Sequence, residues 1–118
     1  GVVFQVAGGC GLGALNAAKE KHVWGIGVDA DQSFLGPHVL TSALKGVDTS
    51  VFLTVRAVQN GSFRGGGDAV FGLDRAGVGL GKVSPKASKA DVAATRRIVA
   101  QLAGGKIRNI PTTIGVSP

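Results

Sequence analysis

The chain has 118 residues, enough for one small domain, and its formal net charge is +6. Its apolar fraction of 44% excludes an intrinsically disordered chain, and no apolar run reaches the ~18 residues of a membrane-spanning helix. Because Cys10 is the only cysteine, an internal disulfide is excluded as well.

The first part of the chain alternates short apolar runs with a helical pattern. Residues Val2 to Val6 predict a buried strand, Gly11 to Lys21 an amphipathic helix, and Val23 to Val28 a second strand. A turn at Gly36-Pro37 follows, and the β-rich run His38 to Leu44 predicts a third strand.

The second part contains two predicted helices. Residues Val47 to Gln59 place valines on one helical face, and Lys89 to Ala103 form a helix for which Ser88 is a suitable N-cap. Between them we expect a fourth strand at 68–73 and a short, glycine-rich fifth strand at 77–83. The tail at 106–118 is predicted to be irregular.

Continuous apolar strands that alternate with helices are typical of a parallel sheet covered on both faces. We therefore expect an α/β fold, with a parallel sheet in a three-layer lobe. In such sheets, ligands bind at the carboxyl ends of the strands. The residues that follow each strand are the first candidates for a site.

A glycine-rich turn joins the first strand to the first helix. Residues Gly9 to Ala14 fit G-x-G-x-x-A, a variant of the dinucleotide fingerprint, and Asp29 lies at the end of the next strand. An aspartate there can accept hydrogen bonds from the vicinal hydroxyls of any ribose. The pattern thus indicates a sugar or nucleoside more firmly than a dinucleotide. The alternative is that the glycines only permit a tight turn.

Three further side chains stand near this turn or the strand ends. Lys45 ends the third strand, so it is expected at the same edge as Asp29, where it could donate to a hydroxyl or an anion. The alternative is an ordinary surface lysine before the following helix. Asp31 is interpreted as a solvated loop acid or a cap of the following turn rather than as half of an acid–base pair. Cys10 is interpreted as a small packing residue, since no histidine is suitably spaced to activate it.

Four segments resemble a known family. They are VVFQVAGGCGLG at 2–13, GIGVDADQSFL at 25–35, VLTSALK at 39–45 and VFGLDRAGVGL at 70–80. In this order they resemble the basic membrane protein family, the PnrA-like nucleoside-binding lipoproteins of bacterial ABC importers. The resemblance implies a type I periplasmic-binding fold, in which two α/β lobes close on a ligand in the cleft between them.

The resemblance also implies a site and a function. Ala7, Gly8 and Gly9 would line the cleft, Asp29 would hold the ribose hydroxyls, and Lys45 would assist at the sugar. The ligand would be a purine nucleoside or a related small molecule, with no metal, cofactor or enzymatic reaction. In the intact protein, the partners would be ABC permease subunits, and the location would be the cell envelope, either lipid-anchored or periplasmic.

Members of this family are considerably longer than the chain. Because the sequence also lacks methionine, we expect residues 1–118 to be the C-terminal lobe and closing segment, without the N-terminal lobe. Such a chain offers half a cleft, so nucleoside binding should be weak or undetectable. We also expect it to self-associate through exposed apolar surface.

Three other classes of function stay open. The dinucleotide-binding domain of an NAD(P)-dependent oxidoreductase would rest on G-x-G-x-x-A and Asp29. A nucleic-acid-binding module would rest on the positive charge, but the basic residues are scattered, and five Phe with one Trp are too few for a stacking platform. We therefore expect no nucleic-acid partner. A transcription regulator could use the same sensor fold.

Overall fold

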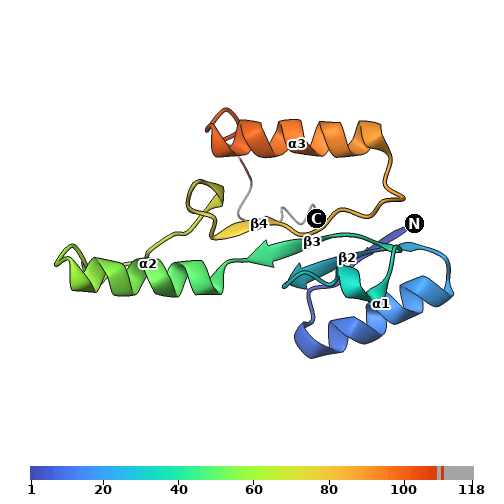
Figure 1. The fold of residues 1–118 in the computed structure, drawn as a ribbon, viewed down its shortest axis with the longest axis horizontal. Helices are drawn as coiled ribbons and strands as arrows, with labels where there is room; N and C mark the ends of the chain where they lie inside the picture. The colour runs from blue at the N-terminus through green and yellow to red at the C-terminus, as the bar shows by residue number, and fades with distance from the viewer. Residues whose placement is uncertain (109, 111–118) are drawn as a thin grey trace, which may run out of the picture.

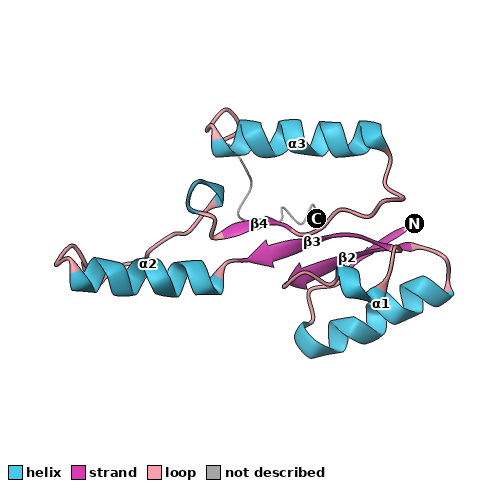
Figure 2. Cartoon of the chain, in the orientation of Figure 1, coloured by secondary structure: helices cyan, strands magenta, loops and turns pink. Residues whose placement is uncertain are grey.

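A computed structural model describes residues 1–108 and 110 (Figures 1 and 2). Its helices and strands, in chain order, are β1 (Val2–Phe4), α1 (Gly11–Glu20), β2 (Trp24–Asp29), β3 (Val39–Lys45), α2 (Val47–Gln59), β4 (Val78–Leu80) and α3 (Lys89–Ala103). Short 3-10 helices lie in the connections at Gly8–Cys10, Ser33–Leu35 and Leu73–Arg75.

The strands form one sheet in the order β1-β2-β3-β4. The pairs β1–β2 and β2–β3 are parallel, as expected, but β4 is antiparallel to β3, so the sheet is mixed. The reversal follows from how the chain re-enters the sheet. The backbone N–H of Gly46, directly after β3, donates to the carbonyl of Gly77, directly before β4, at 2.8 Å. Beginning beside the end of β3, β4 runs back along it.

Helices lie on both faces of this sheet, which confirms the three-layer α/β lobe (Figure 1). On one face α1 packs on β1 and β2, and its Leu15 and Ala18 are buried together with Val39 of β3. On the other face α3 stands over a cavity of about 680 Å³, which is lined by residues of the sheet and by Val92 and Val99 of the helix. The hydroxyl of Ser88 accepts the Asp91 N–H, confirming the predicted N-cap.

Helix α2 projects beyond the end of the sheet (Figure 2). Its bounds are those predicted, and none of its residues is buried. The predicted apolar stripe is open to solvent, with exposed fractions of 51–58% at Val47, Val51, Val55 and Val58. The projection makes the molecule extended: its radius of gyration is 17.0 Å, against about 13.5 Å for a compact domain of this length.

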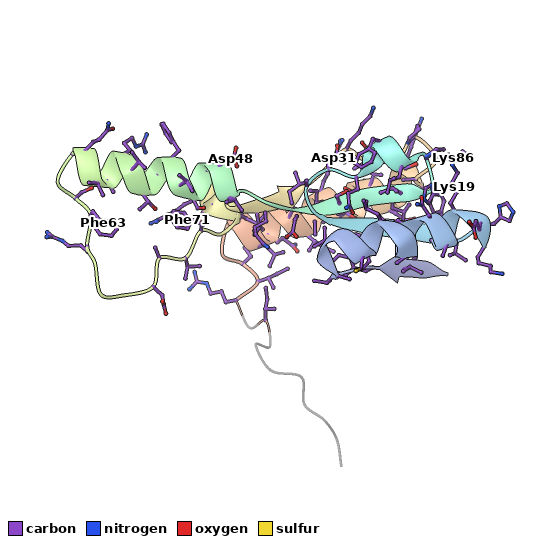
Figure 3. All side chains as sticks on the ribbon, turned by 90° about the horizontal axis from the view of Figure 1, so that it is seen from below. Lys19, Asp31, Asp48, Phe63, Phe71 and Lys86 are labelled. Atoms are coloured by element: carbon purple, nitrogen blue, oxygen red, sulfur yellow. The ribbon has the colours of Figure 1, made fainter. Side chains whose placement is uncertain are left out.

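The prediction of a fourth strand at 68–73 is wrong. This segment has no strand, because it runs back along α2 instead of joining the sheet (Figure 3, Phe63 and Phe71). The N–H groups of Ser62 and Phe63 donate to the carbonyl of Ala57 in α2, at 2.9 and 3.0 Å. The sheet edge is occupied by β4, which lies within the predicted fifth strand.

Most of the irregular tail predicted at 106–118 lies outside the described residues. Within the part of the chain that the structure describes, no helix combines the length and the apolar character needed to cross a bilayer.

Candidate ligand-binding site

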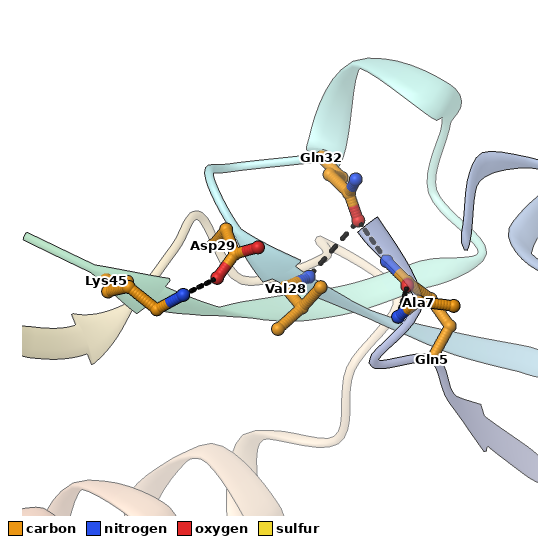
Figure 4. A network of polar contacts seen from close by, with 6 residues as sticks. All are labelled: Gln5, Ala7, Val28, Asp29, Gln32 and Lys45. Carbon is orange, nitrogen blue, oxygen red and sulfur yellow. Dashed lines mark hydrogen bonds and ion pairs between the residues drawn. The ribbon is translucent and has the colours of Figure 1, made fainter. Parts of the chain in front are cut away.

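Asp29 and Lys45 meet at the carboxyl ends of β2 and β3 (Figure 4). The parallel register pairs Asp29 with Leu44, so Lys45 is one residue further along, and its Nζ is 2.7 Å from Asp29 Oδ1. Both side chains are more than half exposed, at 51% for Asp29 and 63% for Lys45. An ion pair this exposed adds little to folding stability. Because both side chains are exposed, the carboxylate of Asp29 and the ammonium of Lys45 can also form hydrogen bonds to a ligand.

The backbone of Asp29 has an unusual conformation. Its φ is +66°, in the left-handed region that few residues other than glycine adopt, although aspartate is among the enriched exceptions. Directly after it, the N–H of Ala30 donates to the carbonyl of Val28 at 2.8 Å. The strand thus ends in a sharp turn that carries the carboxylate at the sheet edge.

The turn after β1 is also open to solvent. Ala7, Gly8 and Gly9 are all exposed, and Gly8 has a φ of +53°, which favours glycine. A Cβ built on Gly8 or Gly9 would meet nothing within 4 Å. The backbone of this turn therefore faces free space, and a ligand can approach it closely.

A network of side-chain amides, the buried Gln5 and the partly buried Gln32, connects this turn with the end of β2 (Figure 4). Gln5 Oε1 accepts the N–H of Ala7 at 3.1 Å, and Gln5 Nε2 donates to Gln32 Oε1 at 2.9 Å. The same Gln32 oxygen accepts the N–H of Val28 at 3.2 Å. The N–H of Gln32 donates to Ser42 Oγ of β3 at 3.0 Å. Four hydrogen bonds thus join segments from three neighbouring strands.

Two glycines make room for these amides. A methyl group on Gly11 would overlap the side-chain amide of Gln5, and one on Gly27 would approach Ser42 Oγ to 2.5 Å and Gln32 Oε1 to 2.7 Å. Gly9, the other glycine of the predicted fingerprint, has no such neighbour within 4 Å, and neither has Gly13, which lies between Gly11 and Ala14. The glycine at position 11 is therefore explained by packing inside the chain, without a phosphate.

Asp31 caps the turn that follows β2, which confirms that interpretation. Its Oδ1 accepts the N–H of Ser33 and its Oδ2 accepts the Ser33 hydroxyl, both at 3.1 Å. Desolvation alone would raise the pKa of Asp31, but the hydrogen bonds from Ser33, with a contribution from Lys82, lower it below its ordinary value.

The interpretation of Cys10 as a small packing residue is wrong, because Cys10 is exposed.

The larger cavities lie away from the predicted site residues. One of about 840 Å³ is lined by the end of α1, by Trp24 and His38 at the amino ends of β2 and β3, and by Lys86 (Figure 3, Lys19 and Lys86). Asp29 and Lys45 are at the opposite ends of these strands. The candidate site is therefore an exposed edge of the sheet rather than one of these cavities.

Gln5 and Gln32 were not predicted as part of the site. Gln5 directly follows the apolar strand β1 and is only 4% exposed, although its side chain is polar. The signal in the sequence was a single amide within the apolar run VFQVAG. A polar residue in such a run is unfavourable unless its hydrogen bonds are satisfied, so it indicates a buried polar network.

Solved structures share this arrangement of sheet and helices. A transcriptional activator of the comK gene from Bacillus halodurans superposes with a TM-score of 0.84 over 92% of this chain and 38% of its own, at 21% identity. An ABC transporter solute-binding protein from Aeropyrum pernix K1 superposes with a TM-score of 0.72 over 95% of this chain and 41% of its own, at 23% identity. The fold is that of a lobe of a periplasmic-binding-type protein.

The sequence places the chain within one family of that fold. The family described as "ABC transporter substrate-binding protein PnrA-like" matches residues 1–109, and the chain belongs to it. Basic membrane protein D of Borreliella burgdorferi is 41% identical over 83 residues, and the nucleoside-binding protein BmpA of Lactococcus lactis is 39% identical over 98 residues. The matches cover 67% and 68% of this chain but only 24% and 28% of those proteins. The resemblance seen in the four segments is confirmed.

Proposed function

We propose that the chain supplies one side of a nucleoside-binding cleft in the substrate-binding component of a bacterial ABC importer. The observation that carries this proposal is the contact between Asp29 and Lys45, 2.7 Å apart at the carboxyl edge of the sheet and both open to solvent. In α/β sheets this edge is where ligands bind.

The two charged groups complement a ribose. The carboxylate of Asp29 accepts hydrogen bonds from two vicinal hydroxyls, while the ammonium of Lys45 donates to a hydroxyl oxygen. Hydrogen bonds to charged groups are the stronger kind, at about 1.5–3 kcal/mol each. The exposed turn at Ala7, Gly8 and Gly9 offers backbone against which the rest of the nucleoside can lie.

The family supports this choice of ligand. The chain belongs to a family of ABC transporter substrate-binding proteins, and its Lactococcus lactis relative BmpA is named as a nucleoside-binding protein. We propose that the remainder of a family-length protein supplies the opposite lobe and that closure of the two lobes traps the nucleoside. Permease subunits would then receive it at the cell envelope. Binding and release require no chemical reaction.

A dinucleotide site is not favoured. Its main support was the glycine fingerprint, and Gly11 is now explained by the Gln5 side chain that occupies the space beside it. The family match points to solute binding as well.

A titration followed by NMR tests the proposal on the isotope-labelled chain. Inosine at millimolar concentration should shift the amide signals of Ala7, Gly8, Gly9, Asp29 and Lys45, with weak affinity because only half of the cleft is present. Amides of α3 serve as the internal control and should not move. Shifts centred instead on Trp24 and His38 would contradict the proposed site, and stronger shifts with NAD than with inosine would favour the dinucleotide alternative.

A further inference from the structure

We propose that Gln5 and Gln32 are positioning residues that hold the turn at Ala7, Gly8 and Gly9 at a fixed spacing from Asp29. The inference rests on the proposed function, because it names the residues that keep that site in its binding conformation. Among the described residues, no hydrogen bond joins either glutamine side chain to Asp29 or Lys45, so both act through the backbone.

The hydrogen bonds end at the backbone of the site. On one side Gln5 holds the N–H of Ala7, the first residue of the turn. On the other side Gln32 holds the N–H of Val28, whose neighbour is Asp29. Between them, Gln5 Nε2 donates to Gln32 Oε1 at 2.9 Å and so links the two side chains. The two parts of the candidate site are thus joined by three hydrogen bonds in series.

The network is anchored and well packed. Ser42, which is fully buried, fixes the backbone of Gln32 to β3. Gly27 lies opposite Ser42 in the parallel register and leaves space for Gln32, as Gly11 does for Gln5. Partly buried hydrogen bonds such as these restrict the motion of the backbone groups that they join. Ordering the turn before the ligand arrives removes part of the entropic cost of binding.

The direction of the hydrogen bonds distinguishes the two glutamines. Gln5 must be an amide, because its oxygen accepts from Ala7 while its nitrogen donates to Gln32. Gln32 uses only its side-chain oxygen in this network, where it accepts twice. A glutamate at position 32 therefore preserves both bonds, whereas an ionised glutamate at position 5 places two acceptors face to face.

This asymmetry gives a matched pair of variants, Gln5→Glu and Gln32→Glu, each adding one negative charge. At neutral pH we expect Gln5→Glu to weaken inosine binding by about tenfold and to speed hydrogen exchange at the amides of Ala7 and Val28. Gln32→Glu should stay within about threefold of the wild-type affinity, with both amides protected. Equal effects of the two variants would overturn the inference.

The pH dependence of Gln5→Glu gives a readout that general destabilisation would not. A protonated carboxyl group has one O–H donor, so it restores the bond to Gln32. Burial raises the pKa of such a carboxyl group, so inosine binding by Gln5→Glu should recover as the pH falls from about 7 to about 5. A progressive loss of binding over this range would contradict the proposed role.

If Gln5→Glu does not fold, Ser42→Ala tests the same network from its anchor. It removes the acceptor for the Gln32 N–H and should weaken inosine binding several-fold. Its control is Ser84→Ala, because Ser84 is also buried but bonds to Pro37 and Lys86, away from the site. Equal affinities of these two variants would overturn the inference.

The outcomes separate this inference from the proposed function. If the wild type binds inosine and both glutamate variants bind it equally well, the proposed function stands and the positioning role is wrong. If millimolar inosine leaves the wild-type amide signals unshifted while Gln5→Glu alone loses amide protection, the network holds the turn as described and the proposed inosine contact on this chain is wrong.

Discussion

The ammonium of Lys45 and the carboxylate of Asp29 are 2.7 Å apart because the parallel register of β2 and β3 places their last residues side by side. Strand pairing, rather than either side chain, sets this contact. Since a shift of one residue would move every side chain to the opposite face of the sheet, the site depends on the correct register.

The ion pair should be more important for binding than for folding. We expect Asp29→Asn to change the free energy of unfolding by less than about 1 kcal/mol, because the pair is exposed. The same change should weaken inosine binding by about tenfold, since a charged hydrogen-bond acceptor is lost. Chemical denaturation and NMR titration measure the two effects.

Asp74→Asn is the matched control for this prediction. Asp74 forms a comparably exposed ion pair with Arg75, at 3.7 Å, in a 3-10 helix that precedes β4. The Asp74→Asn substitution should change neither the free energy of unfolding nor the affinity for inosine appreciably. Equal affinities of Asp29→Asn and the wild type for inosine would show that Asp29 does not bind the ligand.

The glycines of the first turn should differ sharply in their tolerance of a methyl group. Gly11→Ala is expected to destabilise the chain by about 1–3 kcal/mol, because the new Cβ overlaps the Gln5 amide. Gly13→Ala should instead stabilise it by about 0.5–1 kcal/mol, because it lies within α1 with open space beside it. Thermal or urea unfolding compares them. Similar stabilities of the two variants would show that the Gln5 amide does not occupy this space.

Asp31 should contribute to the acid limb of the stability curve. Because the pKa of Asp31 is lowered in the folded state, its contribution is present above the ordinary aspartate value and is lost as the pH falls through the folded value. Asp31→Asn should therefore lower stability at neutral pH and flatten the decline below about pH 4. Urea unfolding across this range checks the prediction, and an unchanged acid limb would mean that the Ser33 bonds do not stabilise the carboxylate.

The valine face of α2 should cause self-association. Four valines at helical spacing are exposed together, a surface typical of an interface. Val55→Lys should shift sedimentation toward the monomer, whereas Gln59→Lys adds the same charge one turn further along the helix and should have a smaller effect. A wild-type chain that sediments as a clean monomer at high concentration would contradict this prediction.

Local patterns predicted the elements whose formation depends on nearby residues. The bounds of α2 and α3 agree with their periodicity and caps, and the three parallel strands were found from apolar runs. The segment 68–73 resembled a strand in composition but lies beside α2, and nothing in its own residues encodes that position. The exposed valines show the same limit, because periodicity identifies an apolar face but not what covers it.

The site was partly predictable for a comparable reason. Asp29 and Lys45 were expected at one edge because parallel strands end together, and the structure places them in contact. The role of Gln5 and Gln32 depends on pairing between distant segments and on the space left by Gly11 and Gly27. Such a network requires the three-dimensional arrangement of three strands, which spacing along the chain does not reveal.

The measurement that tests the central claim most directly compares inosine with 2′,3′-dideoxyinosine in NMR titrations of the wild-type chain. The two ligands share the base and differ only in the hydroxyls that Asp29 and Lys45 are proposed to bind. We predict that inosine shifts the amides of these two residues and binds at least about tenfold more tightly than the dideoxy analogue. Equal shifts and equal affinities for both ligands would contradict recognition of the ribose at this edge of the sheet.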